Sequence, residues 1–123
     1  MISLATVLGM PPEWDVARLP RWADTRNADL PDRARGQIRY EFDLEGDDAT
    51  LMECRPPWRP ANGPDRTRLP IVRFHYSRTS REWSTYRRDR NLDFHRHDPF
   101  PQTPDLDFLL AALDGDHGRT FWG

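Results

Sequence analysis

The segment from residue 37 to residue 45 alternates strictly between polar and apolar side chains. Neighbouring side chains of a β-strand point to opposite faces of the sheet, so this period of two predicts a strand with one buried and one solvated face. A chain that contains such a strand is expected to build an antiparallel sheet that is covered on one side only. The apolar members of the segment are Ile38, Tyr40, Phe42 and Leu44.

Further segments with the same period predict more strands. Residues 45–48 supply turn-forming side chains and residues 49–55 return as a partner strand, so the first two strands form a hairpin. A meander should follow the hairpin, which gives a sheet of four or five strands. Its strands are predicted at residues 71–76, 82–87 and 92–97, and its turns at residues 78–81 and 88–91.

An opening helix is predicted before the sheet, around residues 14–28. Pro20 lies inside this range, and proline is tolerated in the first turn of a helix but disrupts its interior. We therefore expect either a break at Leu19 or a helix that begins near Pro20. A short capped turn should follow at residues 31–35 and end at Gly36.

A closing helix is predicted after the sheet. Thr103 is expected to be its N-cap, and Pro104 its first residue, because proline is favoured at that position. Gly115 and Gly118 are expected to end it. Its apolar stripe predicts one buried face and consists of Leu106, Leu109, Leu110 and Leu113.

Prolines and chain length limit the fold to one domain. Residues 56–70 contain five prolines and are predicted to be an extended connecting loop. A chain of 123 residues has the length of a single domain. We predict one α+β domain at residues 14–123, with the opening and closing helices packed on one face of the sheet. Residues 1–13 are interpreted as a leader that is disordered, or that is not translated if synthesis starts at Met10.

The hydrophobic core must depend on aromatic side chains. Leu, Ile, Val and Phe make up only 24 of 123 residues, whereas 14 residues are aromatic and five of these are Trp. Phe121 and Trp122 are accordingly expected to pack on the closing helix. Cys54 is the only cysteine, so no internal disulfide can form and a cytoplasmic location is expected. The longest apolar run, residues 108–113, is too short for a membrane span.

Charge is distributed unevenly along the chain. Residues 68–97 contain eight Arg and three acidic residues, a net charge of +5, although the whole chain carries −2. Both flanks are acidic. The basic middle segment could therefore bind an anionic partner, or it could pair with the acidic ends of its own chain.

Three short segments carry a resemblance to a known family. Residues 53–58 read Glu-Cys-Arg-Pro-Pro-Trp, residues 88–92 read Arg-Asp-Arg-Asn-Leu and lead into Phe-His-Arg, and the chain ends on Phe-Trp-Gly. Together they resemble the signature segments of a small bacterial family catalogued only as a domain of unknown function, over residues 15–123. This resemblance implies a single bacterial domain and no activity. The chain departs from the family's pattern at Pro20, Thr85 and Arg87.

His95 and His97 are candidate metal ligands. Residues i and i+2 of a strand share a face, so both imidazoles could reach one ion, with Asp98 or His75 as a third ligand. Two histidines are too few for a structural zinc site, so we expect no metal and no cofactor. A lone cysteine in an alternating strand, such as Cys54, behaves as a small hydrophobe more often than as a nucleophile. A small hydrolase or metal-dependent enzyme that uses His95 and His97 remains an alternative.

The sheet face away from the helices is the strongest candidate for a binding surface. If Val72, Phe74, Leu92 and Phe94 face the helices, the opposite face gathers basic and aromatic side chains. A ring among arginines suits base stacking combined with phosphate contacts. The candidate binding residues are Arg73, His75, Tyr86, Arg88, Arg90 and His95, together with Trp58 in the proline-rich loop.

These residues favour a non-catalytic binding module. A protein partner is favoured over single-stranded nucleic acid, and no membrane contact is expected. Because residues 68–97 hold the excess of positive charge, we expect any anionic ligand to depend on Arg88, Arg90 and Tyr86 rather than on arginines of the first half.

Overall fold

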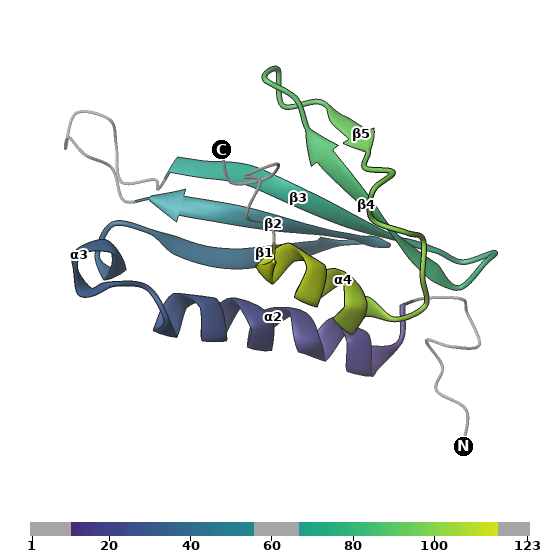
Figure 1. Cartoon of the computed structure of the whole chain (residues 1–123), viewed down its shortest axis with the longest axis horizontal. Helices are drawn as coiled ribbons and strands as arrows, with labels where there is room; N and C mark the ends of the chain where they lie inside the picture. The colour runs from purple at the N-terminus through teal and green to yellow at the C-terminus, as the bar shows by residue number, and fades with distance from the viewer. Residues whose placement is uncertain (1–10, 56–66, 116–123) are drawn as a thin grey trace.

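The structure, a computed structural model, describes residues 11–55 and 67–115. It is an α+β fold in which a five-stranded sheet, in the order β1-β2-β3-β4-β5 and antiparallel throughout, carries its helices on one face (Figure 1), as predicted. The strands are β1 (Arg39–Glu45), β2 (Asp48–Arg55), β3 (Thr67–Ser77), β4 (Glu82–Arg88) and β5 (Phe94–Arg96). The helices are α2 (Glu13–Ala28), α3 (Asp32–Arg35) and α4 (Leu106–Asp114).

The hydrophobic core lies between the sheet and the two longer helices. The predicted hairpin of β1 and β2 turns at Gly46, whose φ of 59° lies in the left-handed region that glycine adopts easily. All four leucines of the predicted α4 stripe are buried, so this part of the helix prediction is confirmed. The largest fully buried side chains include Trp83, Phe74, Leu19, Leu51 and Val72.

The opening helix is continuous, so both predicted alternatives, a break at Leu19 and a helix start near Pro20, are wrong. Helix α2 runs through Pro20 and begins at Glu13, one residue before the predicted start of the domain. Proline removes one backbone hydrogen bond from a helix interior. Leu19 and Ala23, on either side of Pro20, are buried against the sheet, and this packing holds the helix together.

Strand β3 begins earlier than the proline pattern predicted. It includes Pro70, which we had placed in the connecting loop. The pairing register of β2 and β3 shifts between Leu51 and Met52, so Pro70 lies at a β-bulge. Proline is compatible with a strand at a bulge because the regular ladder of hydrogen bonds is interrupted there. The rest of the proline-rich segment, residues 56–66, lies outside the described residues.

Two further boundaries differ from the prediction. Leu92 was expected in a strand facing the core, but it is exposed and has a φ of 67°, so β5 starts only at Phe94. Thr103 was expected to cap α4, but its backbone pairs with Trp83 in an isolated bridge. The helix therefore begins later, after Asp105. The aromatic residues Phe121 and Trp122 lie outside the described residues.

The free edge of the sheet at β1 is partly closed by a side chain of α2. Asn27 Nδ2 donates to the Tyr40 carbonyl at 2.8 Å, and the Tyr40 N–H donates to Asn27 Oδ1 at 2.7 Å. One amide side chain thus satisfies the two backbone groups that a neighbouring strand would have bound. Such an edge is protected at this point from pairing with another chain.

A buried carboxylate joins α2 to the middle of the sheet. The side chain of Asp15 is buried, and its Oδ2 accepts a hydrogen bond of 3.0 Å from Trp83 Nε1. Burial raises the pKa of Asp15, although the bond from Trp83 and the nearby Arg18 guanidinium act in the opposite direction. Folding therefore raises the affinity of this carboxyl for a proton.

Replacing Asp15 with Asn should make stability less dependent on pH. A folded-state pKa above the unfolded value, about 4 for Asp, means that wild-type stability is lost as pH rises from that value through the raised pKa. Asn keeps an acceptor for Trp83 and carries no charge. In urea unfolding at pH 4 and pH 7, the variant should gain stability relative to the wild type at the higher pH. An equal difference at both pH values would contradict this expectation.

Candidate functional site

The surface of the sheet opposite α2 and α4, here called the open face, collects basic and aromatic side chains from three adjacent strands. Cross-strand pairing places Arg73 opposite Tyr86, Tyr86 opposite Arg96, and Arg88 opposite Phe94. The β4–β5 end of the sheet turns away from the helices (Figure 1), so these strands rise on the open side. We call the set Arg73, Tyr86, Arg88, Phe94 and Arg96 the basic-aromatic patch.

Arg73 is held in a defined position at the centre of this patch. Its Nε donates a hydrogen bond of 2.9 Å to Thr50 Oγ1, and its guanidinium carbon lies 4.1 Å from the centroid of the Phe94 ring. A cation over an aromatic face is electrostatically favourable. Within the described residues, the two terminal nitrogens of Arg73 have no hydrogen-bond partner, so they are available to an anionic group.

Tyr86 and Arg88 extend the patch along β4. The ring of Tyr86 meets the ring of His75 edge-on, with centroids 6.4 Å apart. Arg88 Nε is buried and has no hydrogen-bond partner in the described part of the chain. A buried donor without a partner is costly, so a bound group that accepted its hydrogen bond would recover that cost.

In the half of the open face that lies over β1 and β2, the basic side chains of Arg68 and His75 are already paired with carboxylates. Arg68 binds Glu41 at 2.7 Å and also pairs with Asp43, while His75 Nδ1 lies 2.7 Å from Asp48 Oδ1. Cys54 lies in the same half and is buried, and this burial raises the pKa of its thiol. A raised pKa disfavours the thiolate that nucleophilic catalysis requires.

In the structure, His95 does not lie on the predicted binding surface. His95 pairs across the strands with Arg87, whereas Phe94 pairs with Arg88, so Phe94 lies on the open face and His95 on the other. The prediction had these two residues the other way round. His95 Nε2 lies 2.7 Å from Asp89 Oδ2, and this contact is the main reason that the pKa of Asp89 is lowered.

His95 and His97 do not form a common site. His97 is buried, and its ring packs edge-on against Phe100 at 4.9 Å. Among the residues that the structure describes, no group of three or more His, Cys, Asp or Glu side chains is placed to hold a metal ion. The metal-dependent alternative therefore gains no geometric support from these two histidines.

The remaining predicted residues lie apart from the patch or outside the described chain. Arg90 is exposed in the β4–β5 turn, which Asp89 organises by accepting hydrogen bonds from the backbone N–H groups of Asn91 and Asp93. Trp58 lies in the segment that is not described. Sequence analysis missed Phe94 and Arg96 as members of the patch, because the alternation in residues 92–97 does not reveal which face each side chain takes.

The sequence model of one family, a domain of unknown function (DUF3024), matches residues 10–123. The chain belongs to this family. The match includes every strand and helix described above. No curated protein and no solved structure matches it.

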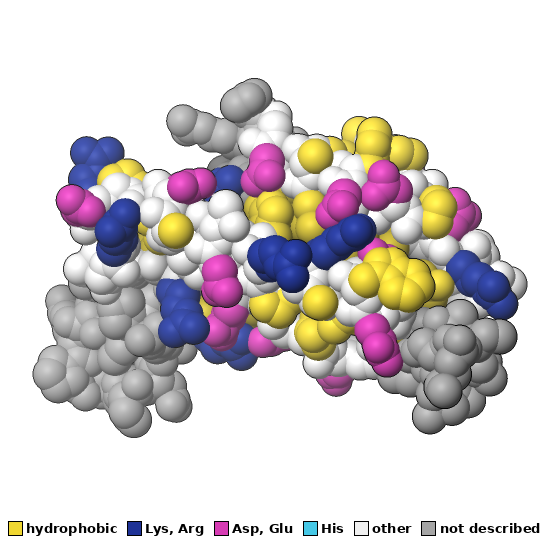
Figure 2. Space-filling model, turned by 90° about the horizontal axis from the view of Figure 1, so that it is seen from below, with side chains coloured by type: hydrophobic (Ala, Val, Ile, Leu, Met, Phe, Trp, Pro, Cys, Tyr) yellow, Lys and Arg dark blue, Asp and Glu magenta, His cyan; other side chains and the backbone are white. Residues whose placement is uncertain are grey.

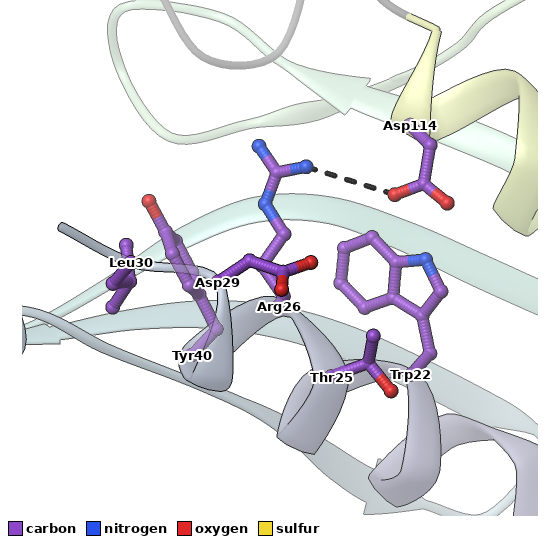
Figure 3. A pocket seen from close by; sticks show the side chains of 7 residues that line it. All are labelled: Trp22, Thr25, Arg26, Asp29, Leu30, Tyr40 and Asp114. Atoms are coloured by element: carbon purple, nitrogen blue, oxygen red, sulfur yellow. Dashed lines mark ion pairs between the residues drawn. The ribbon is translucent and has the colours of Figure 1, made fainter.

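The DUF3024 domain also has a pocket of about 370 Å³ at the C-terminal end of α2. Figure 3 shows that Arg26 rises between the rings of Trp22 and Tyr40 and that its guanidinium is turned toward Asp114. The protein's own cation thus occupies the space between the two rings. Because the Arg26 guanidinium lies between the rings, this pocket is not a candidate ligand site.

The helices that the structure describes were compared with the length and hydropathy of a membrane span. In residues 11–55 and 67–115, none combines the length and apolar composition that crossing a bilayer requires.

Proposed function

We propose that this protein is a non-catalytic binding module of the bacterial cytoplasm whose open face takes an acidic protein partner. The observation that carries the proposal is that three arginines of the open face have no carboxylate partner. Arg73, Arg88 and Arg96 form no ion pair within the described residues, whereas Arg68 on the same face binds two carboxylates. Unpaired guanidinium groups held on a sheet surface are suited to bidentate contacts with carboxylates.

The distribution of charge on the open face favours a protein over a long polyanion. The basic-aromatic patch covers only the β3–β5 half, and the adjoining half presents Glu41, Asp43 and Asp48. A uniformly negative polymer that ran across the whole sheet would meet these carboxylates. A protein surface can match such a pattern residue by residue, which gives specificity as well as attraction.

Single-stranded nucleic acid is the second candidate, and one observation favours it. The rings of Tyr86 and Phe94 lie on the same face as the unpaired guanidinium groups, and Arg73 covers one side of the Phe94 ring. Bases stack on such rings while arginines contact phosphates. A strand of a few nucleotides would fit within the basic half without reaching the acidic one.

Retention on an immobilised acidic peptide of about four glutamates, which can lie on the β3–β5 half of the open face alone, tests the proposal. The chain has a net charge of −2, so charge alone does not predict retention on a polyanion. Wild-type protein should bind at low salt and elute as salt rises. The triple variant Arg73→Gln, Arg88→Gln, Arg96→Gln should no longer be retained, because it lacks the cations of the patch.

A matched control variant removes three positive charges outside the basic-aromatic patch. Arg21, Arg33 and Arg81 are exposed and also form no ion pair in the described residues, so the triple variant with Gln at these positions has the same net charge. It should elute with the wild type. If the two triple variants elute together, binding follows net charge only and the proposal fails.

A further inference from the structure

A second surface feature lies on the helix-bearing side of the sheet and is independent of the open face. It is a cavity of about 520 Å³ between the first half of α2 and the turn that joins β1 to β2. A cavity of roughly 150 Å³ already accommodates a benzene molecule, so this one has room for several aliphatic side chains. Figure 2 shows this side of the molecule, where hydrophobic side chains reach the surface between arginines and carboxylates.

Most side chains in the cavity wall are apolar, and some of them are open to water. Ala17 and Pro20 on α2 are exposed, and Leu44 on the hairpin is 50% exposed. The other apolar residues of the wall are Pro11, Val16, Leu19, Ala49 and Trp83. Covering such a group of apolar side chains with another apolar group is favourable, because it removes their surface from water.

The carboxylates beside the cavity do not require a charged occupant. Asp47 Oδ2 accepts a hydrogen bond of 2.8 Å from Arg78 Nε, and Asp48 Oδ1 lies 2.7 Å from His75 Nδ1. The third carboxylate, that of Glu13, is exposed to water. A charged occupant would lose hydration against the apolar wall without gaining an unpaired partner, so the wall favours an uncharged apolar occupant.

The segment that precedes the described residues has the composition that this wall favours. Seven of residues 1–10 are apolar and none is charged, although 31% of the whole chain is charged. Pro11, the next residue, lines the cavity, so the segment is attached at the cavity rim. The part of α2 in the wall, residues 13–20, is about 12 Å long, whereas ten extended residues reach about 33 Å. The segment is therefore long enough to cover the cavity, and its attachment gives it an effective concentration in the millimolar range.

We propose that residues 1–10 of this chain, here called the N-terminal segment, occupy the cavity beside α2. Aliphatic side chains of the segment pack against Ala17, Pro20 and Leu44 and remove them from water. An external apolar molecule binds at this place only by displacing the segment. The inference does not rest on the proposed function, which concerns the opposite face of the sheet.

A double-mutant cycle in the full chain tests this inference. The triple variant Ile2→Ser, Leu4→Ser, Leu8→Ser should lower the folding equilibrium constant at least about tenfold in urea unfolding, because burial of one leucine alone contributes that much. In the Ala17→Phe background, where the new ring fills the cavity, the same serine substitutions should have little effect. In the Ala111→Phe background they should keep their full effect, because Ala111 is also an exposed helical residue but does not line the cavity.

Assigned ¹H–¹⁵N spectra locate the contact. The serine substitutions should shift the amides of Leu44, Gly46 and Ala49 and leave those of Tyr86 and Arg88, on the open face, unchanged. The inference is overturned if the serine variant is as stable as the wild type, if its effect is equal in the two phenylalanine backgrounds, or if no cavity amide shifts. Cavity shifts that depend on protein concentration would also overturn it, because they would identify a second copy of the chain as the occupant.

Discussion

Replacing Trp83 with Ala is expected to lower the free energy of unfolding by about 3–5 kcal/mol, the usual cost of truncating a buried aromatic residue. The side chain is 1% exposed, and its ring packs against Tyr76 with centroids 5.1 Å apart. Its backbone also pairs with Thr103, in the segment that leads into α4. The residue therefore connects α2, the sheet and the approach to the last helix, and urea unfolding followed by circular dichroism should show the loss.

The variant Trp83→Phe separates the hydrogen bond from the packing. Phenylalanine keeps most of the ring volume but cannot donate to Asp15, which leaves a buried carboxylate with one donor fewer. That loss should cost about 1–3 kcal/mol, less than the Ala substitution. If Trp83→Ala were no more destabilising than Trp83→Phe, packing of the ring would not be what holds these elements together.

Patterns that depend on neighbouring residues were predictable from the sequence. Alternation from residue 37 to residue 45 identified β1 and its partner, because a strand with one solvated face imposes a period of two. Leucines at helical spacing identified the buried side of α4 in the same way. Both patterns report on local geometry, and local geometry is what a sequence period encodes.

The face taken by each side chain of β5 was not predictable from alternation. Alternation with a period of two shows which side chains of a strand share a face. It does not show which of the two faces points toward the helices. The left-handed residue Leu92 extends the turn, and β5 then pairs Phe94 with Arg88. A shift of one residue exchanges the two faces of a strand. In the structure, Phe94 therefore contacts Arg73, and His95 does not lie on the predicted binding surface.

Contacts between distant residues were also beyond the sequence patterns. Asp15 and Trp83 are 68 positions apart, and neither period predicts that a carboxylate of the first helix turn accepts the indole N–H. Pro70 was misplaced for a related reason, because its place in β3 depends on a bulge in the pairing with β2.

Binding of a single-stranded RNA of about five nucleotides, within the range of sites on small nucleic-acid-binding folds, measures the contributions of the Tyr86 ring and of the arginines separately. If the second candidate function is correct, Tyr86→Ala should weaken binding by about 1–3 kcal/mol, the value of one base stacked on an aromatic ring. This loss should be nearly the same at low and high salt, because stacking does not involve counterions. Titrations of the wild type and the variant at two salt concentrations measure it.

The arginine variants, unlike Tyr86→Ala, should change the dependence of binding on salt. Each phosphate contact contributes about −0.7 to the slope of log K against log salt for single strands, so Arg73→Gln and Arg88→Ala should each make the slope shallower by that amount. Arg21→Gln, on the outer side of α2, should leave the slope unchanged. Absence of binding by the wild type at low salt would eliminate nucleic acid as the partner. Binding with equal slopes in all variants would show that the basic-aromatic patch is not where the strand lies. Retention on the acidic peptide without RNA binding would leave the acidic protein as the proposed partner.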